Sequence, residues 1–176
     1  TKMPMPALPG RPERHDYEYE RCGVCNVFMA CEPLAGKRMT KVTERKTRSD
    51  WARFLQDIAG RYGGAEKITL VMDNLSTHTP GALYAAFAPA EAKALWERFE
   101  FVYTPKHGSW LNMAEIELNV MIRQCLSRRV SSVQELAGSV LAWQSHRDQL
   151  RAKVNWQFTT EDARIKLKRL YPTLLE

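Results

Sequence analysis

The alternation of hydrophobic and polar residues in the first part of the chain predicts a β-hairpin. Residues 17–34 are rich in aromatic, Cys, Val and Met residues, and they predict two strands or one long bent strand. Pro and Gly between residues 33 and 38 indicate a turn, and residues 39–43 alternate as a further strand.

The middle of the chain combines a helical pattern with a strand pattern. Apolar residues between 51 and 58 fall on one helical face, with Ser49 or Asp50 as the expected N-cap. Residues 68–72 form a short, continuous apolar run, which is typical of a strand that is buried on both faces.

Five further helices and one strand are predicted in the rest of the chain. The first is a helix that Thr79 caps and that runs to residue 87, and a helix over 89–96 and a strand over 99–103 follow it. The next helix covers 110–126 and is capped by Ser109. The last two helices start with the capping box Ser132–Glu135 and with the cap Thr160. This order of elements predicts an α/β sandwich built on a mixed sheet.

Composition and charge narrow the class of protein. The chain has 176 residues, of which 44% are hydrophobic, and this predicts a globular domain. Its formal net charge of +6 favours a polyanionic partner, with nucleic acid as the first candidate. Ordinary solubility charge is the alternative reading. Basic residues are concentrated in 37–48 and 151–170, as expected of a surface that follows a phosphate backbone. We expect no membrane span and no signal peptide, and hence a cytoplasmic location.

Two acidic residues stand where a carboxylate can do chemistry. Asp73 follows the buried strand, and ligands of open α/β sheets bind at the carboxyl ends of strands; a turn that ends the strand is the alternative. Glu115 follows Leu111 by four residues, which places it in or beside the apolar stripe of its helix, whereas Glu117 is expected on the solvent side. A carboxylate on a buried side is costly unless it is paired or bound to metal; a salt-bridged Glu at the rim is the alternative.

The surroundings of these acids resemble a known family. The block Leu111-Asn112-Met113-Ala114-Glu115 resembles the Leu-Asn-Pro-Ile-Glu block of Tc/mariner-superfamily transposases, and Val71-Met72-Asp73-Asn74, with His78 following, resembles their Asp-Asn…His block. The stretch 103–117 looks like the bacterial insertion-sequence branch of that superfamily, and residues 158–172 are similar to the C-terminus of those proteins.

The resemblance implies a ribonuclease-H-like fold, with a mixed sheet flanked by helices, and a DDE catalytic triad. Asp73 would be the second acid and Glu115 the third, and together they would bind two Mg²⁺ or Mn²⁺ ions for DNA strand cleavage and strand transfer. The first acid belongs on an earlier strand, whose motif none of the early acids matches (Asp16, Glu18, Glu20 and Glu32). We therefore expect the first strand to be missing, with a partner chain filling the gap or residues lost, and a chain that is inactive without the first Asp. The alternatives are a silent remnant that binds DNA or dimerises, and a ribonuclease-H-like nuclease without strand transfer.

The expected organisation is a Pro-rich extended lead-in over 1–16, a partial catalytic core over 17–130, and a basic helical C-terminal extension over 131–176. The expected partners are DNA, as transposon ends and target, and a second copy of the chain, in the bacterial cytoplasm near the nucleoid. The residues expected to contact nucleic acid are Asn74, His78, Lys106, His107, Lys41, Arg45, Lys46, Lys166, Lys168 and Arg169. A turn amide for Asn74, a backbone-bonded helix-start residue for His78 and a solvated loop for 106–107 are the alternatives.

Overall fold

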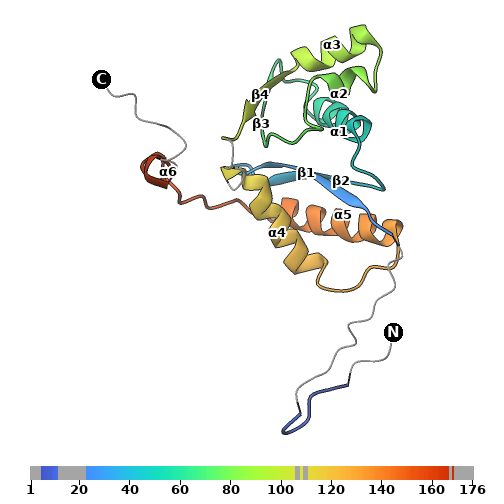
Figure 1. The fold of residues 1–176 in the computed structure, drawn as a ribbon, viewed down its shortest axis with the longest axis vertical. Coiled ribbons are helices and arrows are strands. Elements are labelled where there is room, and N and C mark those ends of the chain that lie inside the picture. The colour runs from blue at the N-terminus through green and yellow to red at the C-terminus, as the bar shows by residue number, and fades with distance from the viewer. Residues whose placement is uncertain (1–4, 12–22, 106–107, 109–110, 167, 169–176) are drawn as a thin grey trace.

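A β-hairpin forms the centre of the molecule, with helices on both of its faces (Figure 1). In this computed structural model, which describes residues 5–11, 23–105, 108, 111–166 and 168, β1 (Asn26–Glu32) pairs antiparallel with β2 (Lys37–Thr43). The predicted hairpin is therefore confirmed, with its first strand placed at the end of the range 17–34.

The two faces of the hairpin contribute to different hydrophobic cores, because successive strand residues point to opposite faces. Phe28 and Met39 face the first core, which is built around α1 (Arg48–Arg61). Val27 and Val42 face the second core, which is built around α5 (Val133–Gln149). The hairpin is thus the middle layer of an α/β/α arrangement.

A second, separate sheet lies on the α1 side. Here β3 (Ile68–Met72) pairs in parallel with β4 (Phe99–Tyr103), and the connection contains α2 (Gly81–Tyr84) and α3 (Pro89–Glu97). The predicted bounds of both strands are confirmed. The expectation that β3 is buried on both faces is wrong, because Met72 packs into the first core whereas Val71, on the other face, is 51% exposed.

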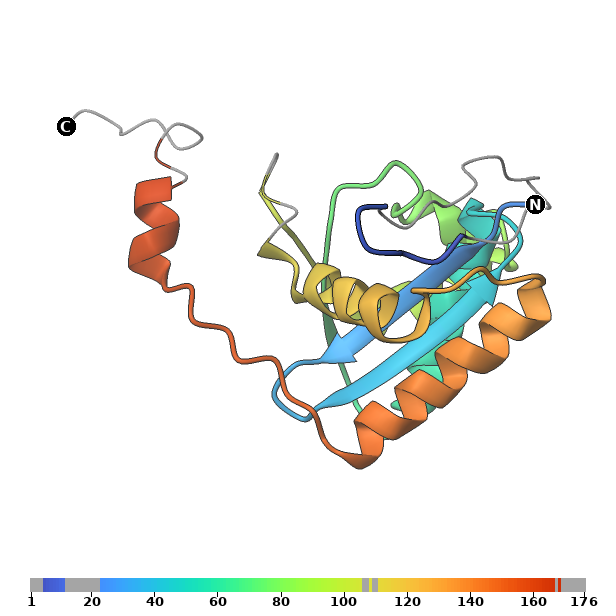
Figure 2. The same cartoon turned by 90° about the horizontal axis from the view of Figure 1, so that it is seen from below.

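The remaining helices, α4, α5 and α6, come after the second sheet in the sequence. The helices α4 (Met113–Cys125) and α5 cover the second face of the hairpin, and α5 packs along β2 with Leu136, Val140 and Trp143 buried. After α5 the chain is extended as far as α6 (Thr160–Lys166), which stands away from the body (Figures 1 and 2). The boundaries at residues 16 and 130 stay predictions. In the described part of the chain, no helix has the length and apolar character needed to cross a membrane.

Several helix starts differ from the predicted ones. A reciprocal capping box between Thr47 and Asp50 starts α1, so the predicted caps Ser49 and Asp50 are wrong. Thr159 makes the same pair of backbone bonds with Asp162 before α6, in place of Thr160. In both cases a hydroxyl residue stands three positions before an acid, which is the capping-box spacing.

Of the other helix starts, some agree with the predicted caps and others do not. Ser132 caps α5 as predicted, since its side chain accepts a bond from the backbone of Glu135. The residue before α2 is Pro80 and makes no side-chain cap, so the predicted cap at Thr79 is wrong. Asn112 caps α4, which starts at Met113 rather than at residue 110; the predicted cap, Ser109, lies outside the described residues.

Candidate active site

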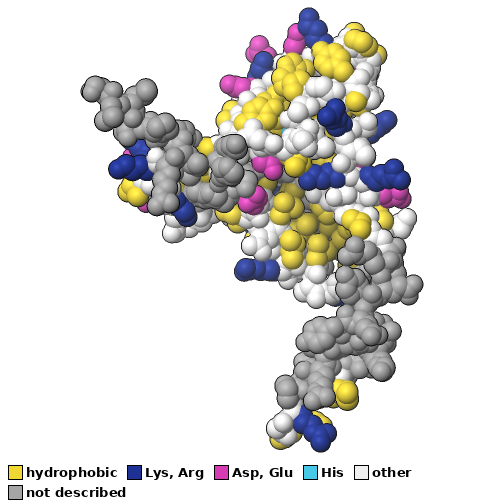
Figure 3. Space-filling view, viewed as in Figure 1, with side chains coloured by type: hydrophobic (Ala, Val, Ile, Leu, Met, Phe, Trp, Pro, Cys, Tyr) yellow, Lys and Arg dark blue, Asp and Glu magenta, His cyan; other side chains and the backbone are white. Residues whose placement is uncertain are grey.

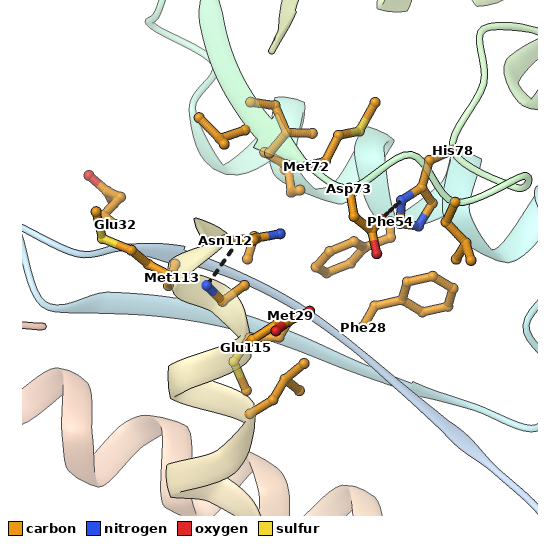
Figure 4. A pocket seen from close by; sticks show the side chains of 18 of the residues that line it. Phe28, Met29, Glu32, Phe54, Met72, Asp73, His78, Asn112, Met113 and Glu115 are labelled. Carbon is orange, nitrogen blue, oxygen red and sulfur yellow. Dashed lines mark hydrogen bonds and ion pairs between the residues drawn. The ribbon is translucent and has the colours of Figure 1, made fainter. Parts of the chain in front are cut away.

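A cavity of about 710 Å³ lies where the two sheets face each other across a gap. Its walls are β1, β3, the buried face of α1 and the first two turns of α4 (Figure 4). Because β1 pairs with β2 and β3 pairs with β4, each of the strands that face the gap has a neighbour on one side. Within the described residues, the cavity is therefore bordered by two strand edges that have no strand paired to them. The polar side chains at its mouth are the candidate site.

Asp73 enters the cavity from the end of β3. Its side chain is 37% exposed, and its Oδ1 lies 3.0 Å from Nδ1 of His78 (Figure 4). Both atoms are buried, and within the described part of the chain neither has a hydrogen-bond partner outside these two residues. The carboxylate of Asp73 thus keeps acceptor capacity for a further ligand.

His78 is held beside Asp73 by stacking on Trp51, with ring centroids 5.2 Å apart and planes inclined by 22°. Burial lowers the pKa of His78 below its usual value, and the nearby charge of Lys46 adds to this, whereas attraction to Asp73 opposes it without cancelling it. The imidazole is therefore neutral at pH 7, and its contact with Asp73 is that of a neutral ring with a carboxylate.

Glu115 reaches the cavity from the opposite side, from the first turn of α4 (Figure 4). The side chain of Asn112 accepts a bond from the backbone of Ala114 at 3.0 Å and so fixes the start of the helix just before Glu115. Glu115 was expected in or beside the buried stripe, and because the residue is exposed it lies beside the stripe, as in the alternative of a Glu at the rim. It lines the rim of the cavity, where a carboxylate is solvated and open to a ligand.

Glu117, in contrast, is buried, with 1% of its surface exposed, so the expectation that it faces solvent is wrong. Its two carboxylate oxygens accept bonds from Nε and Nη2 of Arg38 at 2.6 and 2.9 Å, and Oε1 accepts a third from Arg147 at 3.1 Å. Burial alone would raise the pKa of Glu117, but its bonds to the two guanidinium groups outweigh burial and lower it. The buried stripe of α4 thus contains an ionised carboxylate, which two arginines neutralise.

Residues 1–137 match the sequence profile of a family described as DDE superfamily endonuclease. The chain belongs to this family. Comparison with curated proteins gave no significant match. Membership places the chain among the nuclease and transposase-type enzymes, which act on DNA.

In this DDE endonuclease, the residues at the cavity suit a divalent metal in part. Carboxylate oxygens are the ligands that Mg²⁺ and Mn²⁺ prefer, and the side chain of Asp73 is partly exposed at the cavity. Among the described residues, however, no three His, Cys, Asp or Glu side chains come together as a metal-binding group. Glu32 also lines the cavity, but its Oε1 accepts a bond from the hydroxyl of Tyr62 at 2.5 Å. The donor set that the fold provides here is therefore two carboxylates.

Two of the residues predicted to contact DNA are already engaged within the protein. Asn74 donates from its side chain to the backbone oxygen of Thr104 at 2.7 Å, which ties together the loops after β3 and β4. The ammonium of Lys41 lies 2.5 Å from a carboxylate oxygen of Asp57. In this DDE endonuclease, the amide of Asn74 is thus used within the fold and Lys41 has a carboxylate partner, and their contacts with DNA stay predictions.

Other predicted DNA contacts are spread over the molecule. Lys46 lines the cavity, and Arg45 stands next to it on the exposed loop before α1. Lys166 and Lys168 belong to the α6 region, which stands away from the body (Figure 1). Lysine and arginine side chains do not form one continuous stripe on the face shown in Figure 3. Lys106, His107 and Arg169 lie outside the described residues.

The sequence patterns missed the inward role of Arg38. This residue was counted in the basic stretch 37–48, but only 2% of its surface is exposed and it pairs with Glu117. The signal that could have found it is the alternation of β2, which places Arg38, Thr40 and Val42 on one face, directed at α4 and α5.

Proposed function

We propose that the chain is the catalytic region of a DNA transposase of the Tc/mariner superfamily, from its bacterial insertion-sequence branch, with a ribonuclease-H-like fold. The reaction is metal-dependent cleavage of a DNA strand followed by transfer of the freed 3′-hydroxyl to target DNA. The observation that carries the proposal is that Asp73 and Glu115 come from opposite walls to line one cavity, in a chain of the DDE endonuclease family.

The residues at the cavity have separate roles in this proposal. Asp73 and Glu115 supply oxygen ligands, and the bound Mg²⁺ or Mn²⁺ would stabilise charge on the attacking and leaving oxygens of a phosphodiester. His78 restrains the carboxylate of Asp73 from behind, supported by Trp51. Lys46, an exposed cation at the same cavity, binds a phosphate of the substrate.

The gap between β1 and β3 fits the expected absence of the first strand. A strand placed there would pair with the free edges of both sheets and would close them into one mixed sheet. Its carboxyl end would bring the first acid of the triad toward Asp73 and Glu115. We propose that this strand comes from outside the described residues, from the same polypeptide or from a partner chain.

The expected partners follow from the same reaction. DNA is bound as transposon ends and as target, in the bacterial nucleoid. A homodimer pairs the two ends, and the exposed hydrophobic residues Ile116, Ile122 and Leu141 of α4 and α5 offer a surface for it. Figure 3 shows hydrophobic side chains gathered over this part of the body.

The first test is calorimetric titration of Mn²⁺ into the chain and into its Asp73→Asn and Glu115→Gln variants. Each substitution is expected to abolish binding, because each removes one of two carboxylates that share an ion. Glu97→Gln is the matched control, since it removes an exposed carboxylate on α3 and is expected to leave binding unchanged. Binding that survives Asp73→Asn or Glu115→Gln would refute the role of that residue.

The stoichiometry of the same titration tests the role of the first strand. One ion per chain is expected from two carboxylates, and about two ions once the third acid is added by a longer chain or by a partner. Two ions per chain with the present residues alone would show that the third acid is already here.

A strand-transfer assay separates the transposase from the two alternatives. Once the site is complete, the transposase is expected to join a DNA end with a free 3′-hydroxyl to a target duplex. A nuclease without strand transfer would cut DNA and leave the free end unjoined. A silent remnant would bind DNA and do neither.

A further inference from the structure

The helix that carries Glu115 has few fully buried residues, and one of them is charged. Of the thirteen residues of α4, the buried ones are Glu117 and Met121. They stand four positions apart and therefore lie on one face of the helix, one turn above the other. In its first two turns, the fully buried side chain of α4 is thus the charged one of Glu117, and Leu118 next to it is half-buried against the second core.

The anchor and Glu115 point in nearly opposite directions. Each residue rotates the helix by about 100°, so Glu115 and Glu117 are separated by about 200° around the axis. When Glu117 is fixed against β2, Glu115 is turned to the other side, which here is the rim of the cavity that Asp73 enters. A rotation of the helix by one residue position would move Glu115 by about 100° around the axis, out of its present place on the rim.

The guanidinium of Arg38 fixes this rotation because its donors are committed in several directions. Two of them hold the two oxygens of Glu117 in a bidentate pair. Nη1 donates to the backbone oxygen of Gly36 at 2.9 Å, and Nη2 also donates to the backbone oxygen of Ala152. The planar group is therefore pinned to its own turn and to the chain after α5, and it accepts Glu117 in one orientation.

Residues of α5 and α1 complete the cluster. Arg147 on α5 holds Oε1 of Glu117 from a second direction. Asp148, its neighbour, accepts a bond from the backbone nitrogen of Arg38 at 2.8 Å. Arg61, from the end of α1, donates to the backbone oxygen of Arg38 at 2.9 Å. The cluster therefore joins α1, β2, α4 and α5.

We propose that Arg38 and Glu117 are positioning residues, which set the rotation of α4 about its axis so that Glu115 faces Asp73 across the cavity. The inference rests on the proposed function for the role of Glu115 as a ligand, but the rotation of α4 is a property of the fold alone. A buried ion pair contributes little net stability compared with apolar residues of similar size, whereas its directional bonds restrict geometry. The pair therefore orients α4 more than it stabilises the fold.

The test compares the chain with the double variant Arg38→Leu/Glu117→Leu, using ¹³C-methyl spectra of the methionines. Met113 and Met121 report on α4, and Met72, on β3, reports on the wall across the cavity. The double variant is expected to shift or broaden Met113 and Met121 and to leave Met72 in place, with the urea midpoint nearly unchanged. Mn²⁺ affinity is expected to fall by about tenfold or more, as when other supports of metal ligands are removed.

Two further variants complete the design. Arg128→Gln, the control, breaks the ion pair with Glu135 at the turn between α4 and α5, and it is expected to leave both α4 methionines and Mn²⁺ affinity unchanged. Arg38→Lys keeps the charge but loses the bidentate fork, so it is expected to reproduce the methyl shifts of the double variant. If the double variant does not fold, Arg38→Lys alone decides whether the Arg38–Glu117 pair sets the rotation of α4.

The outcomes for the two proposals are distinguishable. Unchanged α4 methionine signals in the double variant, or in Arg38→Lys if only that variant folds, would overturn the positioning role, whatever the metal does. Shifted signals together with unchanged Mn²⁺ affinity would overturn it as well, since Glu115 would then not depend on the rotation. A parent chain that binds no Mn²⁺ would count against the proposed function, while the methyl signals would still decide whether the pair sets the rotation of α4.

Discussion

Replacing Glu117 by Leu is expected to destabilise the protein strongly, although Leu is apolar and of similar size. The substitution removes three charged hydrogen bonds and leaves Arg38, whose side chain is 1% exposed, without its carboxylate partner. Arg147, whose side chain is 15% exposed, lies nearer to water and regains part of its solvation.

The size of this loss of stability is set mainly by the unpaired donors of Arg38. Two of its buried donors lose their acceptor, at about 1–3 kcal/mol each, which gives about 2–6 kcal/mol. This agrees with the cost of about 3–5 kcal/mol for removing one partner of a buried ion pair. Since small domains are stable by about 5–15 kcal/mol, the variant is expected to lose a large share of its free energy of unfolding.

Urea denaturation followed by tryptophan fluorescence measures this change. The double variant Arg38→Leu/Glu117→Leu is the control, because replacing both partners leaves far fewer orphaned donors and is expected to cost much less than Glu117→Leu alone. A loss below about 1 kcal/mol in Glu117→Leu would refute the reasoning, because it would mean that Arg38 is not committed to Glu117 in a dry site.

Three further predictions concern the core, the hairpin turn and the alkaline range. Leu55→Ala is expected to lower the free energy of unfolding by about 2–5 kcal/mol in the same assay, since Leu55 is fully buried in the first core. Gly36→Ala is expected to lower the free energy of unfolding by more than about 1 kcal/mol, because Gly36 has φ +66° and a Cβ there would lie 2.5 Å from the backbone of Arg151. The melting temperature is expected to fall with it, and an unchanged melting temperature would contradict the prediction. Burial and the bond to Glu32 raise the pKa of Tyr62 to about 12. The stability that Tyr62 contributes is therefore present below about pH 10 and is lost as the pH rises toward 12. Tyr62→Phe should remove this part of the pH dependence of stability, and identical stability–pH profiles of the parent and the variant would refute the prediction.

The strands of the second sheet were predictable because each is defined by its own sequence. Residues 68–72 are a short, mostly apolar run and residues 99–103 are rich in aromatic residues, and the bounds of both agree with β3 and β4. Their burial was not predictable in the same way. Val71 is apolar but half exposed, because no neighbouring element of the described chain covers that face of β3. A local pattern gives the type of an element, whereas burial depends on what packs against it.

The two glutamates of α4 illustrate the same limit at the candidate site. Periodicity placed Glu115 in or beside the apolar stripe because it follows Leu111 by four residues, and it placed Glu117, about 200° further around the helix, on the solvent side. The partner that reverses this assignment, Arg38, stands 79 positions earlier in the chain. Since the cost of burying a carboxylate depends on its counter-ions, the orientation of α4 was not readable from its own sequence.

The candidate site depends on the junction between two cores that are otherwise separate. Asp73 is fixed by the first core, through β3 and through Trp51 behind His78, whereas Glu115 is fixed by the second core, through the pair of Glu117 with Arg38. The hairpin is common to both, because its strands send alternate residues into each core. Any change that shifts the hairpin relative to one core therefore alters the separation of the two carboxylates without unfolding either core. For this reason substitutions at the cluster around Arg38 are expected to affect the site more than substitutions of equal cost in the interior of either core.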